Sequence, residues 1–254
     1  NTFSILMNIT SVNKKPIDEW LLSELHTKLD KVNHALDNFD LRTASDLIYF
    51  GLHNDIRWYL RRNGRNKEVI REFLDVWIKL MSLVTPHIAE EINFIFGNDY
   101  LLVTSKWPNF DKKKIKPSNE NYIRQVLDDI NYISNYKKIV PRKITLIVAE
   151  NWKYDLLKKI KKEFDKNKNV SDIIKKVMDK KYKEEIPEIV NKVIKDKTKL
   201  NFIESQDKEF NLLSENKEFF EKEFKAEIEI IKTEKSNFGK KRQAYPGKVA
   251  IIIE

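Results

Sequence analysis

The side chains best suited to binding chemistry gather in residues 54–62, which read Asn-Asp-Ile-Arg-Trp-Tyr-Leu-Arg-Arg. Arg57 and Arg61 are four residues apart and would share one face of a helix, while Trp58 and Arg62 would share the neighbouring face. Guanidinium groups fork onto phosphate oxygens and stack on flat rings. The stretch therefore predicts contact with an RNA backbone. The alternative is an aromatic core pair flanked by solvated arginines.

A second basic group lies near the end of the chain, in a long loop over 234–248 between two expected strands. Its candidate binding residues are Lys240, Lys241, Arg242 and Lys248. Tyr245 places an aromatic ring among these cations, and such a mixture suits both the phosphates and the bases of RNA. Long loops in compact domains are mostly functional or disordered. The alternative is the basic tip of a hairpin that has no partner.

Lysine is dense between residues 158 and 199, in stretches expected to be helical. Examples are Lys158, Lys159, Lys161, Lys162, Lys175, Lys176, Lys180, Lys181 and Lys183. Stacked along helices, these cations would form a salt-sensitive phosphate-binding surface. The alternative is a mixed surface in which interspersed acids serve only solubility. We favour the phosphate-binding interpretation for the set and the mixed surface for any single lysine.

The side chains that catalysis or metal binding would need are missing. The chain has no cysteine, which excludes a thiol nucleophile, a disulfide and a thiolate metal site. His87 begins a His-Ile-Ala-Glu-Glu run that looks like an inverted zinc-protease helix, but Glu91 stands where a second histidine is needed. The five glycines form neither a P-loop nor a dinucleotide fingerprint. We therefore predict no catalytic and no metal-binding residue.

The overall charge points to a polyanionic partner. Among 254 residues, 48 basic side chains face 39 acidic ones, a net charge of +9. Such a field favours nucleic acid or an acidic membrane surface. No apolar run is long enough to span a bilayer and no signal peptide is evident, so we expect a cytoplasmic protein without a membrane partner. Because the chain begins at Asn1 and not at Met, we expect a piece of a longer protein.

Residues 1–110 are expected to form the element that positions the arginine stretch. Apolar residues recur three or four apart in four amphipathic segments, at 17–39, 41–59, 69–84 and 88–95. Asp40 is suited to cap the second helix, Pro86 to open the fourth and Gly97 to end it. Four such helices joined by short turns predict an antiparallel bundle.

A Lys-rich linker at 111–117 is expected to separate the bundle from a second domain over 118–254. The continuous apolar run 144–149 predicts a central strand. Apolar and acidic residues alternate at 226–230, which predicts a half-buried strand. The apolar run 249–253 predicts a second buried strand, after the one at 144–149. Helices fill the intervals. We therefore predict a mainly α protein, with an antiparallel helical bundle followed by a small α/β domain of about three strands.

Four segments, taken in order, carry a family resemblance. Asp-Glu-Trp-Leu-Leu-Ser-Glu-Leu at 18–25 resembles the start of the class I anticodon-binding bundle. The arginine stretch is similar to a run in archaeal leucyl enzymes. Thr-Pro-His-Ile-Ala-Glu-Glu at 85–91, followed by Trp107 and proline, resembles a pattern of leucyl, isoleucyl and valyl enzymes. The tail 243–254 looks like the leucyl C-terminus. The chain thus resembles the C-terminal part of a leucyl-tRNA synthetase of archaeal and eukaryotic-cytosolic type.

Two positions depart from the family pattern, since Val249 replaces the usual proline and Tyr245 the usual methionine. The ATP-binding motifs and the editing insertion are missing, so this piece alone lacks the catalytic motifs of its parent ligase. The resemblance implies that ATP and Mg²⁺ belong to a catalytic domain elsewhere in the parent chain, and that this fragment needs no cofactor.

The resemblance also implies a division of labour. The bundle would sit against the body of tRNA-Leu, and the second domain would hold its long variable arm; DNA is not expected as a partner. The implied tRNA contacts are Arg57, Trp58, Arg61, Arg62, Lys240, Lys241, Arg242, Lys248 and Glu254. A different class of function stays open, a helical module that docks a protein partner in a translation assembly without RNA specificity. Such a module would expose a large apolar patch.

Overall fold

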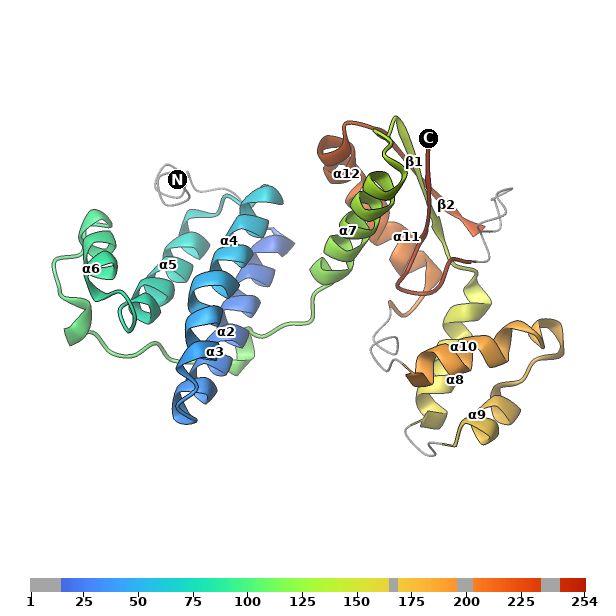
Figure 1. The fold of residues 1–254 in the computed structure, drawn as a ribbon, viewed down its shortest axis with the longest axis horizontal. Coiled ribbons are helices and arrows are strands. Elements are labelled where there is room, and N and C mark those ends of the chain that lie inside the picture. Colours follow the sequence, from blue (N-terminus) through green and yellow to red (C-terminus); the bar gives the residue numbers. More distant parts are fainter. Residues whose placement is uncertain (1–14, 165–168, 196–202, 234–242) are drawn as a thin grey trace. The chain divides into compact units, whose positions relative to one another are not determined.

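The computed structural model describes residues 15–164, 169–195, 203–233 and 243–254 (Figure 1). The chain divides into two compact units, Asn1–Glu120 (unit 1) and Asn121–Glu254 (unit 2). The segment expected as a linker, 111–117, falls within unit 1 and is hydrogen-bonded to its first described helix. Ser23 Oγ donates to the Lys116 carbonyl over 3.1 Å and accepts from the Lys116 N–H over 2.9 Å.

Unit 1 is the predicted helical bundle. Its elements are α2 (Pro16–Asp37), α3 (Leu41–Asp46), the π-helix η1 (Leu47–Gly51), α4 (Leu52–Arg61), α5 (Lys67–Met81), α6 (Pro86–Ile95) and the 3₁₀ helices η2 (Leu102–Thr104) and η3 (Lys112–Lys114). The helix predicted over 41–59 is present as three consecutive elements, α3, η1 and α4. The helix α2 contacts all three as well as α5, so it lies at the centre of the bundle.

Local sequence explains where these helices begin. Pro16 occupies the first turn of α2, where a missing N–H costs nothing. The Asp40 carboxylate accepts from the Thr43 N–H over 3.0 Å at the start of α3. Asn66 Oδ1 accepts from the Val69 N–H over 3.2 Å at the start of α5. Each side-chain oxygen accepts from a backbone N–H in the first turn, where the helix itself offers no carbonyl partner.

The apolar stripes of these helices close into one core. Among its fully buried side chains are Leu21, Leu25, Leu29, Ile48, Leu52, Ile56, Phe73 and Leu80. Removing one such side chain from water stabilises the fold by about 1.5–3 kcal/mol. The π turn fits this core because Trp77 Nε1 donates to the Ile48 carbonyl over 2.8 Å. A polar group inside the core is thereby satisfied.

Unit 2 combines helices with a small sheet. Its elements are α7 (Glu120–Lys137, whose first residue closes unit 1), β1 (Lys143–Val148), α8 (Asn151–Phe164), α9 (Val170–Val177), the 3₁₀ helix η4 (Lys180–Tyr182), α10 (Glu185–Lys195), α11 (Gln206–Glu215), α12 (Lys217–Phe224), β2 (Glu227–Lys232) and β3 (Ala250–Ile253). Both α11 and α12 contact β2, and α11 also contacts β1. These contacts give the sheet a helical cover.

The strand order is β2-β1-β3, so the continuous apolar run forms the central strand as predicted. The strand β1 pairs in parallel with β2 and antiparallel with β3. The last two strands do not pair with each other, so the alternative that the basic loop is the tip of a hairpin is wrong. The reason is that β1 is buried at every position after Lys143 and is covered by a neighbouring strand on each edge.

The connection between β1 and β2 is long because a parallel pair requires a crossover. Its first part, residues 151–195, contains α8, α9 and α10 and is called the helical insert here. In Figure 1 these three helices form a group of their own beside the sheet. They share a separate hydrophobic cluster that includes Leu157, Ile160, Ile173 and Val190. The predicted class, mainly α with a small three-stranded α/β part, is confirmed.

Candidate nucleic-acid interface

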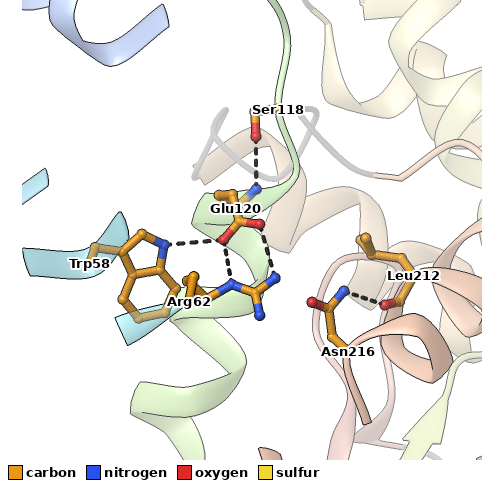
Figure 2. Close-up of polar contacts among 6 residues, drawn as sticks. All are labelled: Trp58, Arg62, Ser118, Glu120, Leu212 and Asn216. Atoms are coloured by element: carbon orange, nitrogen blue, oxygen red, sulfur yellow. Dashed lines mark hydrogen bonds and ion pairs between the residues drawn. The ribbon is translucent and has the colours of Figure 1, made fainter. Parts of the chain in front are cut away.

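The arginine stretch ends α4, and part of it is engaged within unit 1 (Figure 2). Trp58 is only 5% exposed, and its Nε1 donates to Glu120 Oε2 over 3.1 Å. Arg62 donates to both oxygens of that carboxylate, from Nε over 2.9 Å and from Nη2 over 3.0 Å. The side chains of Arg62 and Glu120 are 12% and 13% exposed. Such a forked pair, mostly withdrawn from water, fixes the orientation of both groups.

The other two arginines of this stretch lie at the surface. Arg57 and Arg61 are exposed, and the guanidinium carbon of Arg61 lies 5.8 Å from the centre of the Trp58 ring. The four contacts predicted here therefore divide into two kinds. Two arginines present cations to solvent, whereas Trp58 and Arg62 are held by Glu120. A role in RNA binding stays a prediction for all four.

A buried network holds the end of α4 in place. The Tyr59 hydroxyl donates to Asp18 Oδ1 over 2.5 Å and accepts from the Asn66 N–H over 2.9 Å. Burial first, and then the neighbouring carboxylate, raises the pKa of Tyr59. Gly64 is required beside it, because an added Cβ would lie 2.3 Å from the tyrosine ring. These contacts join α2, α4 and the start of α5, and so position the exposed arginines.

The helical insert of unit 2 carries the lysine-rich sequence. Its described residues hold twelve lysines against seven acids. On α8, four lysines are exposed on the side opposite the insert's core: Lys158, Lys159, Lys161 and Lys162. Lys158 lies 3.4 Å from Asp155, whereas no ion pair within the described residues involves the other three. We call these four side chains the α8 lysine face. A cationic row of this kind suits contacts with phosphates.

The described part of the C-terminal tail begins at residue 243. Tyr245 and Lys248 exchange two backbone hydrogen bonds of 2.9 and 2.7 Å, around a turn in which Gly247 has a φ of +80°. The side chain of Lys248 is exposed at this turn. Glu254 is exposed, and its carbonyl accepts from the N–H groups of Arg142 and Lys143 over 2.7 and 3.1 Å.

Three of the predicted tail contacts, Lys240, Lys241 and Arg242, lie outside the described residues. The remaining two, Lys248 and Glu254, are anchored by backbone bonds and present their side chains to solvent. Their binding role stays a prediction.

A buried glutamate holds the tail turn against the helices of unit 2. Glu209 on α11 is fully buried and accepts from the hydroxyls of Tyr122 and Tyr154, each over 2.5 Å. It also accepts from the Gly247 N–H over 3.1 Å. Nearby, the buried Lys153 Nζ donates to the Ala244 carbonyl over 2.9 Å. The tail turn is therefore fixed by two buried charged side chains.

Burial dominates the electrostatics of this network. It raises the pKa of Glu209 and lowers that of Lys153. Burial and the neighbouring Glu209 carboxylate together raise the pKa of Tyr122 well above its usual value. Low dielectric surroundings disfavour the charged form of each group.

Sequence reasoning missed Glu209, although one signal was available. The residue lies four positions before the buried Leu213, on the apolar face of α11. A carboxylate at an apolar position of an amphipathic helix must find buried donors.

The chain matches the family described as the anticodon-binding domain of tRNA ligase over residues 18–233. The match spans most of unit 1 and most of unit 2. The chain belongs to this family.

Relatives named leucine–tRNA ligase align with nearly all of the chain. The protein of Methanococcus aeolicus is 35% identical over 246 residues, that of Methanocaldococcus jannaschii 39% over 244, and that of Pyrococcus horikoshii 36% over 253. These alignments cover 94%, 94% and 96% of the chain but only 25%, 25% and 26% of the relatives. The chain thus spans about a quarter of their length, and the resemblance to leucyl-tRNA synthetases is confirmed.

One solved structure is also similar, a ternary LeuRS–tRNA–LeuAMS complex from Agrobacterium radiobacter K84. Its TM-score is 0.38 at 15% identity, covering 59% of this chain and 16% of that one. A similarity of this size supports no conclusion about function.

Unit 1 also contains a cleft of about 740 Å³ beside α5. Its charged lining residues are Lys67, Glu68, Arg71, Glu72 and Asp75. Three acids against two bases make this cleft a poorer site for a polyanion than the α8 lysine face.

In the His-Ile-Ala-Glu-Glu run, Glu90 has a structural role. The Glu90 carboxylate accepts from the Leu102 N–H over 2.8 and 3.1 Å, at the start of η2. Among the residues that the structure describes, no three His, Asp or Glu side chains are grouped to hold a metal ion. None of the described helices is long and apolar enough to cross a membrane.

Proposed function

We propose that this chain is the tRNA-binding segment of a leucine–tRNA ligase. It docks the body and long variable arm of tRNA-Leu, so that a catalytic domain outside this chain attaches leucine with ATP and Mg²⁺. The observation that carries the proposal is the alignment of 94–96% of the chain with about a quarter of each archaeal leucine–tRNA ligase. The membership of an anticodon-binding family supports it.

The charges of the two units support two separate roles for the binding residues. One set provides affinity for RNA, and the other selects which tRNA is bound. The α8 lysine face in unit 2 and the exposed Arg57 and Arg61 in unit 1 contact phosphates. The tail residues Lys240, Lys241, Arg242, Lys248 and Glu254 contact the arm. Phosphate contacts supply most of the affinity, and the shape of the long arm decides which tRNA is bound.

A filter-binding assay with three transcripts tests the proposal. The probes are tRNA-Leu, the same transcript without its variable arm, and a tRNA with a short arm. We expect the intact tRNA-Leu to bind most tightly, because it alone offers the arm to unit 2. Equal affinity for all three would remove the claim about the arm, and no binding to any would overturn the proposed function.

The contribution of the α8 lysine face is tested by Lys159→Gln, Lys161→Gln and Lys162→Gln together. We expect weaker binding and a log–log salt dependence flatter by about 2, since each phosphate contact contributes about 0.7–0.9. The matched control replaces Lys217, Lys222 and Lys225 with Gln; these lysines are also exposed, in or just after α12. Equal flattening in both variants would mean that only net charge matters.

One observation favours a second candidate, the docking of a protein partner. Large apolar side chains on and around α6 are 48% to 83% exposed: Leu83, Val84, Ile88, Phe94, Ile95, Leu101 and Val103. Exposed apolar patches commonly mark protein interaction sites. A partner complex that survives ribonuclease and is lost with Ile88→Ser and Ile95→Ser would support this function. Those substitutions should leave affinity for tRNA-Leu unchanged.

A further inference from the structure

Two tyrosines stand out on the surface of unit 2, near the end of α7. Tyr132 is 70% exposed and Tyr136, one turn later, is 80% exposed. Their ring centres are 6.3 Å apart and the ring planes differ by 15°, so the rings lie nearly parallel. Val140, just beyond the helix, is 85% exposed. Single exposed apolar residues need no explanation, whereas apolar side chains that are exposed together commonly mark interaction sites.

The backbone that carries these rings is well fixed. Lys138 has a φ of +55°, and the Ile139 N–H donates to the Ser134 carbonyl over 3.1 Å. Together these features close the helix with a left-handed residue and a bond that reaches back one turn. Arg142 and Lys143 then bind the Glu254 carbonyl, which ties the start of β1 to the C-terminal residue. The tyrosines are therefore held on an ordered support and need little reorganisation to bind a partner.

The residues that follow the rings in the chain are cationic. Lys137, Lys138 and Arg142 are exposed, and none of them joins an ion pair within the described residues. Asp128 and Asp129 lie one turn before Tyr132. A partner that follows this charge pattern places its negative groups near residues 137–142 and its flat apolar groups on the rings. Unpaired nucleotides combine these two features in one molecule.

We propose that the surface formed by Tyr132, Tyr136, Lys137, Lys138 and Arg142 binds unpaired nucleotides of RNA. The bases stack on the two tyrosine rings, and the phosphates contact the cations that follow them. This inference rests on the proposed function, because it places the bases in the unpaired loop of the variable arm. It assigns to α7 a stacking contact with bases that the α8 lysine face, which offers only cations, does not provide.

The test uses the full chain with two synthetic RNAs. One is tRNA-Leu, and the other carries abasic residues in place of the unpaired arm nucleotides, which removes the bases but keeps the phosphates. We expect Tyr132→Ala with Tyr136→Ala to bind the intact RNA about tenfold more weakly, as removal of a stacking platform does. The same variant should bind the abasic RNA as wild type does. Tyr132→Phe with Tyr136→Phe should keep wild-type affinity, because the rings remain.

The lysines give a separate signal. Lys137→Gln with Lys138→Gln should flatten the salt dependence, whereas the alanine pair should leave its slope unchanged, since stacking releases no counterions. If wild type binds tRNA-Leu but the alanine pair binds equally well, this inference is overturned alone. The same holds if the alanine pair loses affinity equally on the abasic RNA. If wild type fails to bind tRNA-Leu, the proposed function and this inference fall together.

Discussion

Each unit of the molecule contains a buried carboxylate that accepts hydrogen bonds from tyrosine hydroxyls. These two carboxylate centres, Asp18 in unit 1 and Glu209 in unit 2, join different parts of the chain. In unit 1, Asp18 accepts from Tyr59, whose hydroxyl also caps the backbone of Asn66. In unit 2, Glu209 accepts from two tyrosines and from the Gly247 N–H of the tail turn. The first centre stabilises the bundle itself, whereas the second fixes a segment that carries predicted RNA contacts.

The comparison shows which cations each unit offers to a partner. In unit 1, Arg62 is paired with Glu120, so part of the arginine stretch serves the fold. In unit 2, the α8 lysine face, Lys137 and Lys138 are exposed, and only Lys158 among them has an ion-pair partner within the described residues. Unit 2 thus presents more uncommitted positive charge. That difference agrees with its proposed role on the variable arm.

The largest expected effect comes from Glu209→Ala. This change removes the hydrogen bonds that Glu209 accepts from two buried tyrosine hydroxyls and a backbone N–H, and the loss of each such bond costs about 1–3 kcal/mol. We expect unit 2 to lose about 3 kcal/mol or more in free energy of unfolding. Hydrogen exchange of β1 peptides measures the loss, and peptides of α2 serve as the control. Equal loss in α2 would mean that the two centres do not act separately.

Glu209→Gln tests the same buried carboxylate through the pH dependence of stability. Burial raises the pKa of Glu209 above its ordinary 4.5, so the folded state holds the proton more tightly than the unfolded state does. The wild-type free energy of unfolding therefore falls as pH rises from 4.5 through the raised pKa. Glutamine does not titrate there, so the stability difference between wild type and variant should change across that window. A difference that is flat with pH would contradict the buried-carboxylate assignment.

A smaller effect, confined to unit 1, is expected for Tyr59→Phe. The substitution keeps the ring but removes the hydroxyl that Asp18 and Asn66 share, at a cost of about 1–3 kcal/mol. Urea unfolding followed by tryptophan fluorescence measures it, since four of the five tryptophans lie in unit 1. Protection of β1 against hydrogen exchange should stay at its wild-type level. A drop there would show that the Asp18 centre also supports unit 2.

The smallest effect is expected for the pair of Arg62 and Glu120. A double-mutant cycle with Arg62→Ala and Glu120→Ala should give a coupling energy of about 1 kcal/mol, at the upper end for exposed pairs because these side chains are mostly buried. The same urea unfolding assay measures it. A coupling energy of zero would mean that Glu120 does not hold Arg62 in solution. Arg62 would then be available to a partner, as the exposed arginines of unit 1 are.

Much of the fold follows from local patterns. The helices of the bundle begin at signals that the sequence shows, such as Asp40, which caps α3, and Pro86 in the first turn of α6. The central position of β1 follows from its mainly apolar sequence. The pairing partners of that strand do not follow, because β2 and β3 could also have paired with each other. The crossover between β1 and β2 decided the order, and so excluded the hairpin alternative.

The candidate site was predictable only in part. The exposed Arg57, Arg61 and α8 lysines stand where helical periodicity places them. Trp58 and Arg62 form hydrogen bonds with Glu120, which lies more than fifty residues away in the chain. No local sequence pattern predicts that contact. The same holds for the contact of Glu209 with Gly247.

By itself, the sequence determined the charge of the molecule, the amphipathic helices, the apolar strands and the family to which the chain belongs. These features are local or additive, so residue types and spacing suffice to specify them. Only the tertiary structure decided which cations remain available, which carboxylates are buried and which rings face solvent. Those properties depend on pairs of residues far apart in the chain, whose meeting is set by packing of the whole unit.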